Sequence, residues 1–405
     1  MVSPVRSDAF SIWVLAAASL ALFVATAAIC ARGPQLPIGS LGVYFDGSLY
    51  IEIARSFPLP YGDQAIGYAG HAPGYPLGIA LVRLATPDSW LDWGGAALIA
   101  SWLPAVASVA LFFALARSAG LAPIWPTLAF ATLHPRWLLS GSAASAESLA
   151  LAGVVASLLA FQQRRPGLAM LALALASTAR YPALLVGIAL AAGWLLFRRD
   201  RRPSVWAWLS LPPLLFAATN AYLYWRVDGF TTVKAAHSVH WQASFVPPFS
   251  AFIEHADLLA GSIDPFVPAA YAMLVVFGLA LVVGWRSRRC AEALGDLRGV
   301  LLIWIAVIVG FHVCLSGPES VWDFTRLTLL AWPAAVLLLW PAIGERAPRA
   351  LLVAACVGMT LLGMRLAKHT VDWAALLQHK GGALERLQDD EPRWLHFGAL
   401  ESRSR

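Results

Sequence analysis

The amino-acid sequence predicts an all-α, polytopic membrane protein with about eleven transmembrane helices. Of its 405 residues, 59% are hydrophobic and only 13% are charged, whereas a soluble domain has about 45–50% apolar and about 25% charged residues. The apolar residues form separate runs near the ~20 residues that a helix needs to cross a bilayer. Arginines gather in short clusters between these runs, which is typical of membrane topology.

Eleven apolar runs define one predicted membrane domain, residues 1–367. The first run is interpreted as a retained helix, because it is longer than the roughly 7–15 apolar residues of a cleaved signal peptide. Prolines inside several runs predict kinks, which membrane helices tolerate. The predicted spans are residues 11–30, 94–116, 122–139, 146–161, 166–179, 183–197, 204–224, 267–285, 299–315, 326–342 and 350–367.

The net charge of +6 does not indicate nucleic-acid binding, because the basic residues flank apolar runs. The four cysteines lie in or beside apolar runs and show no CxxC spacing. We interpret them as packing residues, without a disulfide framework or a metal site.

The basic clusters predict a cytoplasmic N-terminus. In that orientation the compact cluster Arg198–Arg202 lies inside, next to helix ends, where the positive-inside rule has force. Most carboxylates, Asp46 and Glu147 among them, then lie outside. We therefore expect any chemistry on the non-cytoplasmic side. The cytoplasmic loops lack a GxxxxGK[ST] phosphate-binding loop, which argues against a nucleotide-driven pump.

Two external loops are predicted to be long, residues 31–93 and 225–266. The IEIARSF and GIALVRL portions of the first predict short amphipathic helices lying along the membrane surface. The C-terminal tail, residues 368–405, is polar and mixed in charge, and eleven spans would place it outside.

Asp46, in the sequence Tyr44-Phe45-Asp46-Gly47-Ser48, is the candidate catalytic base. An acid among aromatic residues near the interface would be partly desolvated, which raises the pKa of its carboxyl group and its strength as a base. The alternative is a solvated loop acid or a turn former, since Asp-Gly is a common turn dipeptide.

Charged residues near the outer ends of the spans form the candidate donor-binding set. Glu147 opens the fourth span; the alternative to a functional role is a first-turn acid favoured by the helix dipole. Arg180 and Arg326 lie at outer helix ends, and Lys234 lies in the second long loop. Guanidinium groups suit phosphate oxygens, so this set would fit an anionic lipid headgroup. The alternative for each arginine is a simple interfacial anchor.

Three external histidines and a tryptophan complete the candidates. His237 and His240 share a face only if their segment is helical, and zinc would need a third ligand and supporting carboxylates. We therefore expect His71, His237 and His240 to hydrogen-bond sugar hydroxyls or phosphate. Trp241 could stack on a sugar, although interfacial belts are the default role of tryptophan.

The order of these motifs resembles that of the membrane-embedded GT-C glycosyltransferases, in particular the bacterial relatives of the glycosylphosphatidylinositol mannosyltransferase II family. The resemblance covers most of the chain. The residues that carry it are Phe45-Asp46, Tyr50, Ile53-Ala54, Pro73-Gly74-Tyr75-Pro76, Glu147-Ser148-Leu149, Ala176 to Pro182 with Arg180, Val233-Lys234 to Trp241, and Arg326 with Pro333. Departures are Phe45 in place of tryptophan, His71-Ala72 in place of a Phe-rich lead, and one acid where many GT-C enzymes have a pair.

The resemblance implies a GT-C-like fold and inverting transfer of a hexose, such as mannose, from a polyprenyl-phosphate donor. The acceptor would be a lipid, glycan or protein hydroxyl on the periplasmic face of a bacterial inner membrane. Asp46 would take the acceptor proton, and Arg180, Arg326 or Lys234 would stabilise the departing phosphate. Tyr50, His71, Tyr75, Glu147, His237, His240 and Trp241 are assigned to substrate binding. No cofactor is assigned, and the single acid does not support a divalent metal.

The main alternative is a transporter or flippase of a lipid-linked sugar. Transporters usually bind near the bilayer midplane and often contain repeated halves. No predicted span has an ionisable residue at its centre, and no internal repeat is clear. A structural assembly factor is the third interpretation.

Overall fold

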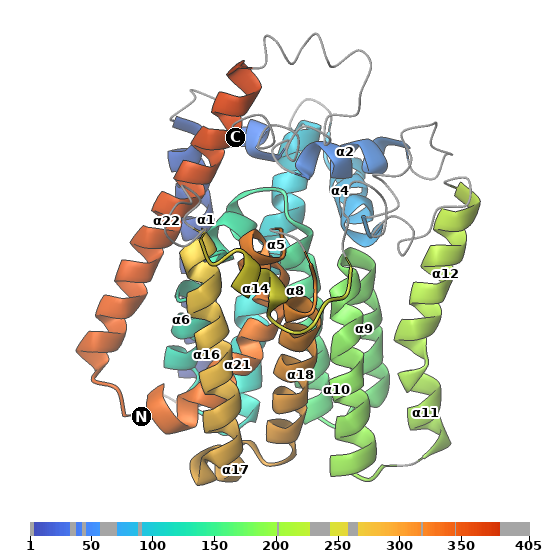
Figure 1. Ribbon diagram of the computed structural model, residues 1–405, viewed down its shortest axis with the longest axis vertical. Coiled ribbons are helices and arrows are strands. Elements are labelled where there is room, and N and C mark those ends of the chain that lie inside the picture. The colour runs from blue at the N-terminus through green and yellow to red at the C-terminus, as the bar shows by residue number, and fades with distance from the viewer. Residues whose placement is uncertain are drawn as a thin grey trace.

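The chain folds into a bundle of helices in the computed structural model (Figure 1). The structure describes residues 4–32, 38–42, 46–56, 71–87, 91–200, 202–226, 244–257, 266–316, 319–344 and 346–380. Within these ranges every regular element is helical, apart from an isolated antiparallel bridge between Phe245 and Leu315. The predicted all-α class is therefore confirmed.

Five helices of the described ranges are long and apolar enough to cross a membrane. Large apolar side chains point outward along them: Trp13 is 74% exposed, Val275 62% and Leu361 62%. Such side chains are unfavourable in water and favourable in lipid, so the chain has the character of an integral membrane protein. The five are α1 (Pro4–Arg32), α5 (Trp93–Ser118), α16 (Phe266–Arg286), α18 (Asp296–Val313) and α22 (Arg349–Lys380).

Shorter apolar helices account for the other predicted runs, so all eleven runs are largely helical. Whether all eleven cross a bilayer stays a prediction. These helices are α6 (Ile124–Thr132), α7 (Trp137–Ser142), α8 (Ala146–Gln162), α9 (Pro166–Ala179), η2 (Tyr181–Leu185), α10 (Val186–Ala192), η3 (Gly193–Phe197), α11 (Pro203–Leu209), α12 (Leu211–Arg226), η4 (Leu329–Ala331), α21 (Trp332–Leu339) and η5 (Trp340–Gly344).

The predicted span of residues 122–139 is divided more widely than any other. It is divided into α6 and α7 by the segment 133–136, which contains His134, Pro135 and Arg136. Proline lacks the N–H of a helical residue and disfavours helical geometry in the residue before it. The break therefore follows from Pro135, and it turns the chain toward the site described below.

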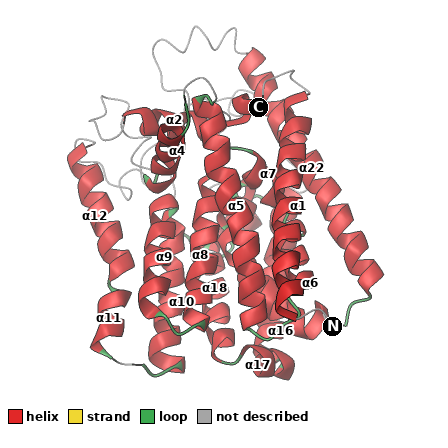
Figure 2. Cartoon of the chain, turned by 180° about the vertical axis from the view of Figure 1, so that it is seen from behind, coloured by secondary structure: helices red, strands yellow, loops and turns green. Residues whose placement is uncertain are grey.

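In the described part of the first loop, the two predicted segments form the short α-helices α2 (Gly47–Ser56) and α4 (Gly74–Ala85). On α2, Tyr50, Ile51 and Ala54 are buried whereas Glu52 is exposed, so this helix is amphipathic. Figures 1 and 2 show α2 across the ends of the long helices, whereas α4 is inclined along them. Only α2 therefore has the flat orientation expected of both.

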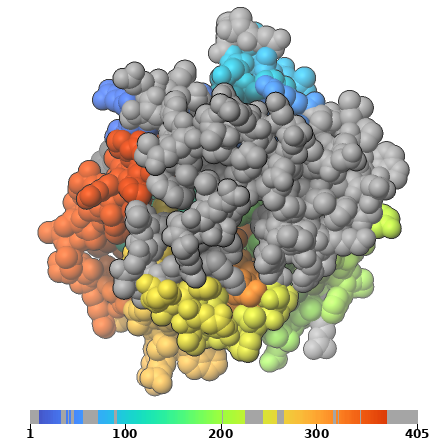
Figure 3. Space-filling model, turned by 45° about the horizontal axis from the view of Figure 1, so that its top comes forward, coloured from blue at the N-terminus to red at the C-terminus, as the bar shows by residue number. Residues whose placement is uncertain are grey.

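The remaining short helices connect the long ones. The helix α22 reaches the end at which α2 lies, whereas α14 lies nearer the middle of the bundle (Figure 1), and Figure 3 shows the α2 end tilted toward the viewer. The helix α17 lies at the opposite end (Figure 1). The short helices are η1 (Ile38–Gly42), α14 (Ser250–Glu254), α17 (Arg288–Leu294), α19 (Glu319–Trp322) and α20 (Phe324–Leu327).

The core is built around α5, α8 and α9, which pack side by side. A Cβ added at Gly153 of α8 would lie 2.9 Å from the carbonyl oxygen of Ala172 on α9, so glycine permits this close approach. The helices α10, α16, α18 and α21 form a second packed group. The indole Nε1 of Trp332, at the start of α21, donates to the carbonyl of Phe130 on α6 at 2.9 Å, and α6 in turn packs against α5.

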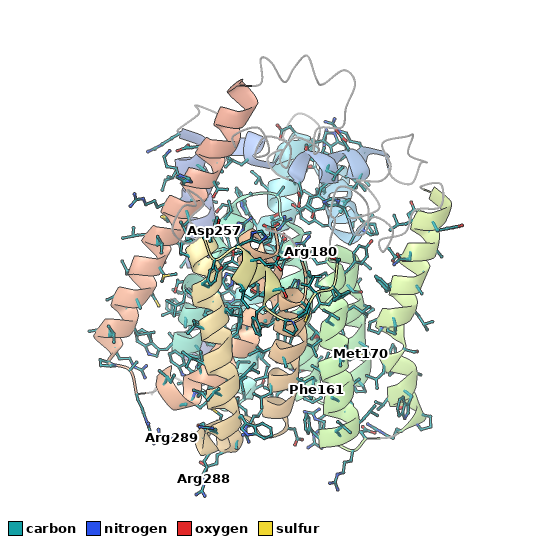
Figure 4. The ribbon with its side chains drawn as sticks, in the orientation of Figure 1. Phe161, Met170, Arg180, Asp257, Arg288 and Arg289 are labelled. Atoms are coloured by element: carbon teal, nitrogen blue, oxygen red, sulfur yellow. The ribbon has the colours of Figure 1, made fainter. Side chains whose placement is uncertain are left out.

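Basic side chains lie toward both ends of the bundle. Arg288 and Arg289 lie at the end where α17 is found, and Arg180 lies toward the other end (Figure 4). This agrees with the predicted separation of the basic clusters from the candidate site residues. The membrane face that each end contacts stays a prediction.

Candidate functional site

Four sequence-predicted residues from four separate segments meet at the end of the bundle where α2 lies. Asp46 immediately precedes α2, and Glu147 stands in the first turn of α8. Arg180 follows the last residue of α9, and Arg326 belongs to α20. Direct contacts between carboxylates and guanidinium groups connect all four.

Glu147 is the centre of this cluster. Its carboxylate is 2.5 Å from Nε of Arg326 and 2.6 Å from Nη2 of Arg180, and it accepts a hydrogen bond of 2.6 Å from the Ser145 hydroxyl. The residue is 2% exposed. An ionised carboxylate is stable at such burial only when it is paired and hydrogen-bonded. Glu147 therefore does more than complement the dipole of α8, because it holds two arginines side by side.

Asp46 shares Arg326 with Glu147. Nη2 of Arg326 donates to Oδ2 of Asp46, and Nε2 of His71 lies 3.8 Å from the same oxygen. Burial alone would raise the pKa of the Asp46 carboxyl, but the neighbouring Arg326 and His71 lower this pKa well below its usual range. The expectation of a raised pKa is therefore wrong, because Arg326 and His71 together outweigh the desolvation of the Asp46 carboxyl.

Tyr50 and Tyr75 support the cluster from behind. The rings of Tyr50 and Tyr75 meet edge to face at 4.9 Å, and Tyr50 contacts His71 in the same way at 5.3 Å. The Tyr75 hydroxyl donates to the carbonyl of Ala97 at 2.8 Å and lies 2.7 Å from the Ser101 hydroxyl. Burial raises the pKa of both tyrosines above its ordinary value, so both stay protonated near neutral pH.

The Tyr75 hydroxyl also fixes the segment that presents Glu147. It accepts a hydrogen bond of 3.1 Å from the backbone N–H of Ser145, and the Ser101 hydroxyl accepts from the same N–H at 2.8 Å. The side chain of Tyr75 is fully buried. In this structure Tyr75 thus positions Ser145, and through it Glu147.

Two glycines let the first-loop helices approach the ends of α8 and α9. A Cβ at Gly47 would lie 2.3 Å from the carbonyl oxygen of Gly42 and 3.1 Å from Cβ of Ala144. A Cβ at Gly74 would lie 2.4 Å from Oγ1 of Thr178. Larger residues at these positions would displace Asp46 from Glu147, or α4 from the segment that carries Arg180.

A small cavity of about 50 Å³ opens within the cluster. Leu139, Ala143 and Ala144 form its apolar wall. Its polar lining consists of Asp46, Arg136, Ser140, Ser145, Glu147 and Arg326. A ligand in this cavity would meet both signs of charge and two hydroxyl-bearing side chains.

Arg136, Ser145 and Asp323 belong to the site although the motifs did not include them. Nη2 of Arg136 lies 3.7 Å from Oδ1 of Asp323, whose Oδ2 lies 3.7 Å from Nη1 of Arg326. The sequence signal for Arg136 was its place directly after Pro135, at an interruption of an apolar run. Ser145 stands two residues before Glu147 in the Ser-rich stretch.

The other predicted site residues lie outside the part of the chain that the structure describes. They are Lys234, His237, His240 and Trp241. Within the described part, no three His, Cys, Asp or Glu side chains are grouped so that they could hold a metal ion.

The cluster as a whole alternates charges of opposite sign. Its three carboxylates and three guanidinium groups are those of Asp46, Glu147, Asp323, Arg136, Arg180 and Arg326. Carboxylates can accept a proton and guanidinium groups can bind phosphate oxygens. The arrangement is therefore chemically suited to a reaction that moves a proton beside an anionic group.

Comparison of the chain with known protein families, with characterised proteins and with solved structures finds no match.

Proposed function

We propose that the protein is a membrane-embedded glycosyltransferase, which moves a hexose such as mannose from a polyprenyl-phosphate donor to an acceptor hydroxyl on the non-cytoplasmic face. The supporting observation is that Asp46, a proton acceptor, shares one charged cluster with Arg180 and Arg326 at one end of an apolar helical bundle. A lipid-linked donor has its tail in the bilayer and its phosphate at the surface. The acceptor would be a lipid, a glycan or a protein.

The proposed reaction is a single displacement at the anomeric carbon. The acceptor oxygen attacks this carbon and forms the new glycosidic bond, while its proton passes to Asp46. The bond between the anomeric carbon and the phosphate oxygen breaks, and its electron pair leaves with the lipid phosphate. Attack opposite the leaving group inverts the configuration. The guanidinium groups of Arg326 and Arg180 stabilise the charge that develops on the phosphate.

The ion pair between Asp46 and Arg326 makes proton transfer depend on the donor. While Arg326 contacts Asp46, the low pKa of that carboxyl makes it a weak base. A phosphodiester anion would compete for Nη2 of Arg326, and loss of this contact would raise the pKa of Asp46. Glu147 would keep its hydrogen bond to Nε of Arg326 during this exchange. Asp46 would thus become an effective base only when the donor is bound.

The position of the cluster supports a transferase more than a transporter of lipid-linked sugars. Transporters generally hold their substrate near the middle of the membrane. Here Glu147 stands in the first turn of its helix and Arg180 follows the last residue of another helix. The charged groups therefore gather at helix ends, where a lipid phosphate resides.

The test is sugar transfer by the purified protein in lipid nanodiscs, supplied with radiolabelled polyprenyl-phosphate hexoses and crude membrane acceptors. We expect labelled product from the wild type. Asp46→Asn should lower turnover by about 10²-fold or more, because a positioned base contributes about 10²–10⁴-fold, while the variant still binds donor.

Glu52→Gln is the matched control, because Glu52 is an exposed acid on the neighbouring helix α2. It should retain wild-type turnover. Normal turnover of Asp46→Asn would refute the proposed mechanism, and translocation of donor without a new glycosidic bond would favour the transporter.

A further inference from the structure

One serine of the segment between α7 and α8 differs from its neighbours in how its hydroxyl group is used. Ser140 is only 5% exposed, and its hydroxyl has no hydrogen-bond partner among the residues that the structure describes. The other three serines of residues 140–148 donate to protein oxygen atoms: Ser142 to the carbonyl of Phe23 at 3.3 Å, Ser145 to Glu147 at 2.6 Å, and Ser148 to the carbonyl of Ser140 at 3.2 Å.

Serines buried inside other helices of this chain satisfy their hydroxyls locally. Ser108, Ser157 and Ser177 each donate to the carbonyl three residues earlier in their own helix, at 2.7 Å. This back-bonding supplies a partner where water is scarce. The Ser140 hydroxyl does not follow this pattern. Because a buried hydroxyl without a partner is unfavourable, a bound ligand is the natural source of the missing hydrogen bond.

The Ser140 side chain lies on the face of α7 that lines the cavity of the charged cluster. Arg136, Leu139 and Ser140 all contribute to the cavity lining, and spacings of three and four residues place side chains on one face of a helix. Gly141 is directed toward α1 instead, because a Cβ at this position would lie 2.1 Å from Cε1 of Phe23. An occupant of the cavity would therefore meet the Ser140 hydroxyl.

The size of the cavity limits what can enter it. Its volume of about 50 Å³ is smaller than a hexose ring, so an edge of a sugar can enter and the whole ring cannot. Ala143 and Ala144 form the wall beside Ser140 and leave room for such an edge. The hydroxyl of Ser140 carries no charge and both donates and accepts hydrogen bonds, which suits a sugar hydroxyl.

The proposed reaction specifies which edge of the sugar lies in the cavity. Asp46 and Arg326 both line the cavity. In that reaction Asp46 takes the proton of the attacking oxygen and Arg326 receives the departing phosphate, so the anomeric carbon lies between them. The hydroxyl on the adjacent ring carbon, the 2-hydroxyl, is the sugar hydroxyl nearest to this centre.

We propose that the Ser140 hydroxyl binds the 2-hydroxyl group of the hexose that is transferred. This inference rests on the proposed function, since it names the residue that recognises the sugar of that donor. Hydrogen bonds to a sugar 2-hydroxyl strengthen as positive charge develops at the anomeric carbon. Ser140 is thus a substrate-binding residue that also selects the sugar, because the orientation of the 2-hydroxyl distinguishes mannose from glucose.

The test is a comparison of donors that differ in single hydroxyl groups. For the full-length protein in nanodiscs, kcat/KM is measured with the polyprenyl-phosphate hexose, its 2-deoxy analogue and its 4-deoxy analogue. The proteins are the wild type, Ser140→Ala and the matched control Ser157→Ala, each also followed by thermal unfolding. Ser157 is a fully buried serine of α8 that does not line the cavity and donates to the carbonyl of Val154.

We expect Ser140→Ala to lower kcat/KM about tenfold for the hexose and 4-deoxy donors, through loss of a hydrogen bond that strengthens in the transition state. For the 2-deoxy donor the loss should be no more than about twofold, because that donor lacks the partner hydroxyl. Each donor is compared with itself between proteins, so differences in intrinsic reactivity cancel. Ser157→Ala should stay within about twofold of the wild type for every donor.

Thermal unfolding separates substrate binding from a structural role. Ser140→Ala removes no hydrogen bond between described residues, so its melting temperature should equal that of the wild type. Equal loss of kcat/KM for the hexose and 2-deoxy donors would overturn the inference, as would unchanged kcat/KM in Ser140→Ala. If this variant does not fold, Ser140→Cys, whose thiol is a weaker hydrogen-bonding group, takes its place in the same comparison.

The outcomes also separate this inference from the proposed function. Sugar transfer that is insensitive to Ser140→Ala would refute only the role of Ser140. A loss confined to donors that retain a 4-hydroxyl would show that Ser140 contacts a different edge of the sugar, and would overturn the assignment to the 2-hydroxyl. Absence of transfer by the wild type from every donor would refute the transferase itself and this inference with it.

Discussion

Arginines at the two ends of the molecule contact different partners. At the end opposite α2, Arg298 donates to the carbonyls of Gly284 and Trp285 at the end of α16, and Arg198 donates to the carbonyl of Phe161 near the end of α8. These arginines satisfy carbonyls that have no partner inside their helices. At the end where α2 lies, Arg180 and Arg326 contact the buried carboxylate of Glu147.

The comparison shows that a count of charges along the chain does not identify a site. Both ends carry arginines, and at the first end Arg198 also lies 3.9 Å from Asp296, whose side chain is 50% exposed. The distinguishing feature of the other end is a carboxylate held almost without solvent between two arginines. A buried ionised side chain costs folding free energy. Side chains of this kind are frequent at functional sites, where their charge is needed.

Glu147→Gln should have the largest effect on stability. The variant leaves Arg180 and Arg326 beside a neutral amide, and breaking a buried ion pair destabilises a protein by about 3–5 kcal/mol. We expect this loss in the free energy of unfolding, measured with denaturant in detergent, together with loss of sugar transfer. The matched control is Asp296→Asn, whose exposed pair with Arg198 is worth about 1 kcal/mol or less. Equal losses of the free energy of unfolding in both variants would contradict the expectation that the buried ion pairs of Glu147 stabilise the protein more than the exposed pair of Asp296.

Arg326→Gln should change how stability depends on pH. In the wild type the pKa of Asp46 is lower in the folded state than in the unfolded state. The resulting stabilisation is fully present above the unfolded pKa of about 3.9 and is lost as the pH falls through the lower folded value. Without Arg326 the pKa of Asp46 should rise, so the variant should lose less stability on acidification. Melting temperatures from about pH 7 down to about pH 2, with Arg298→Gln as control, test this; parallel curves for wild type and Arg326→Gln would contradict it.

Tyr75→Phe should have the smallest effect on stability but a selective effect on activity. It removes a buried hydroxyl with three hydrogen-bonding neighbours, which costs about 1–3 kcal/mol, and it loosens the segment that presents Glu147. The control is Tyr271→Phe, which removes a hydrogen bond from the Tyr271 hydroxyl to the carbonyl of Phe252 and none to the segment that presents Glu147. Both should lower the melting temperature, and only Tyr75→Phe should slow sugar transfer. Equal transfer rates would show that Tyr75 does not position the site.

Much of the fold was predictable because its signals are local. Apolar runs near the length of a membrane span are visible without tertiary information, and all eleven are largely helical. The split of residues 122–139 also had a local cause in Pro135, although the hydropathy of the run concealed it. Glu147, Arg180 and Arg326 were identified because each is an ionisable residue at an end of an apolar run, and Asp46 because it stands beside aromatic residues in the first external loop.

The arrangement of the site was less predictable because it depends on distant segments. Asp46 and Arg326 are 280 residues apart in the sequence, and Glu147 and Arg326 are 179 apart. The aromatic neighbours of Asp46 suggested a raised pKa, whereas desolvation of this carboxyl is outweighed by His71 together with Arg326, a guanidinium from the far part of the chain. Arg136 had no motif of its own, and only the folded chain brings it beside the cavity.

The break between α6 and α7 also has a consequence for how the protein is made. Peptide groups outside a helix are tolerated at membrane depth only where protein shields them from lipid. The break is covered in part by α21, whose Trp332 binds the carbonyl of Phe130, 202 residues earlier in the chain. The contacts of this region with α21 therefore form only after residues 332–339 have been synthesised, so the region is completed late although its sequence is early.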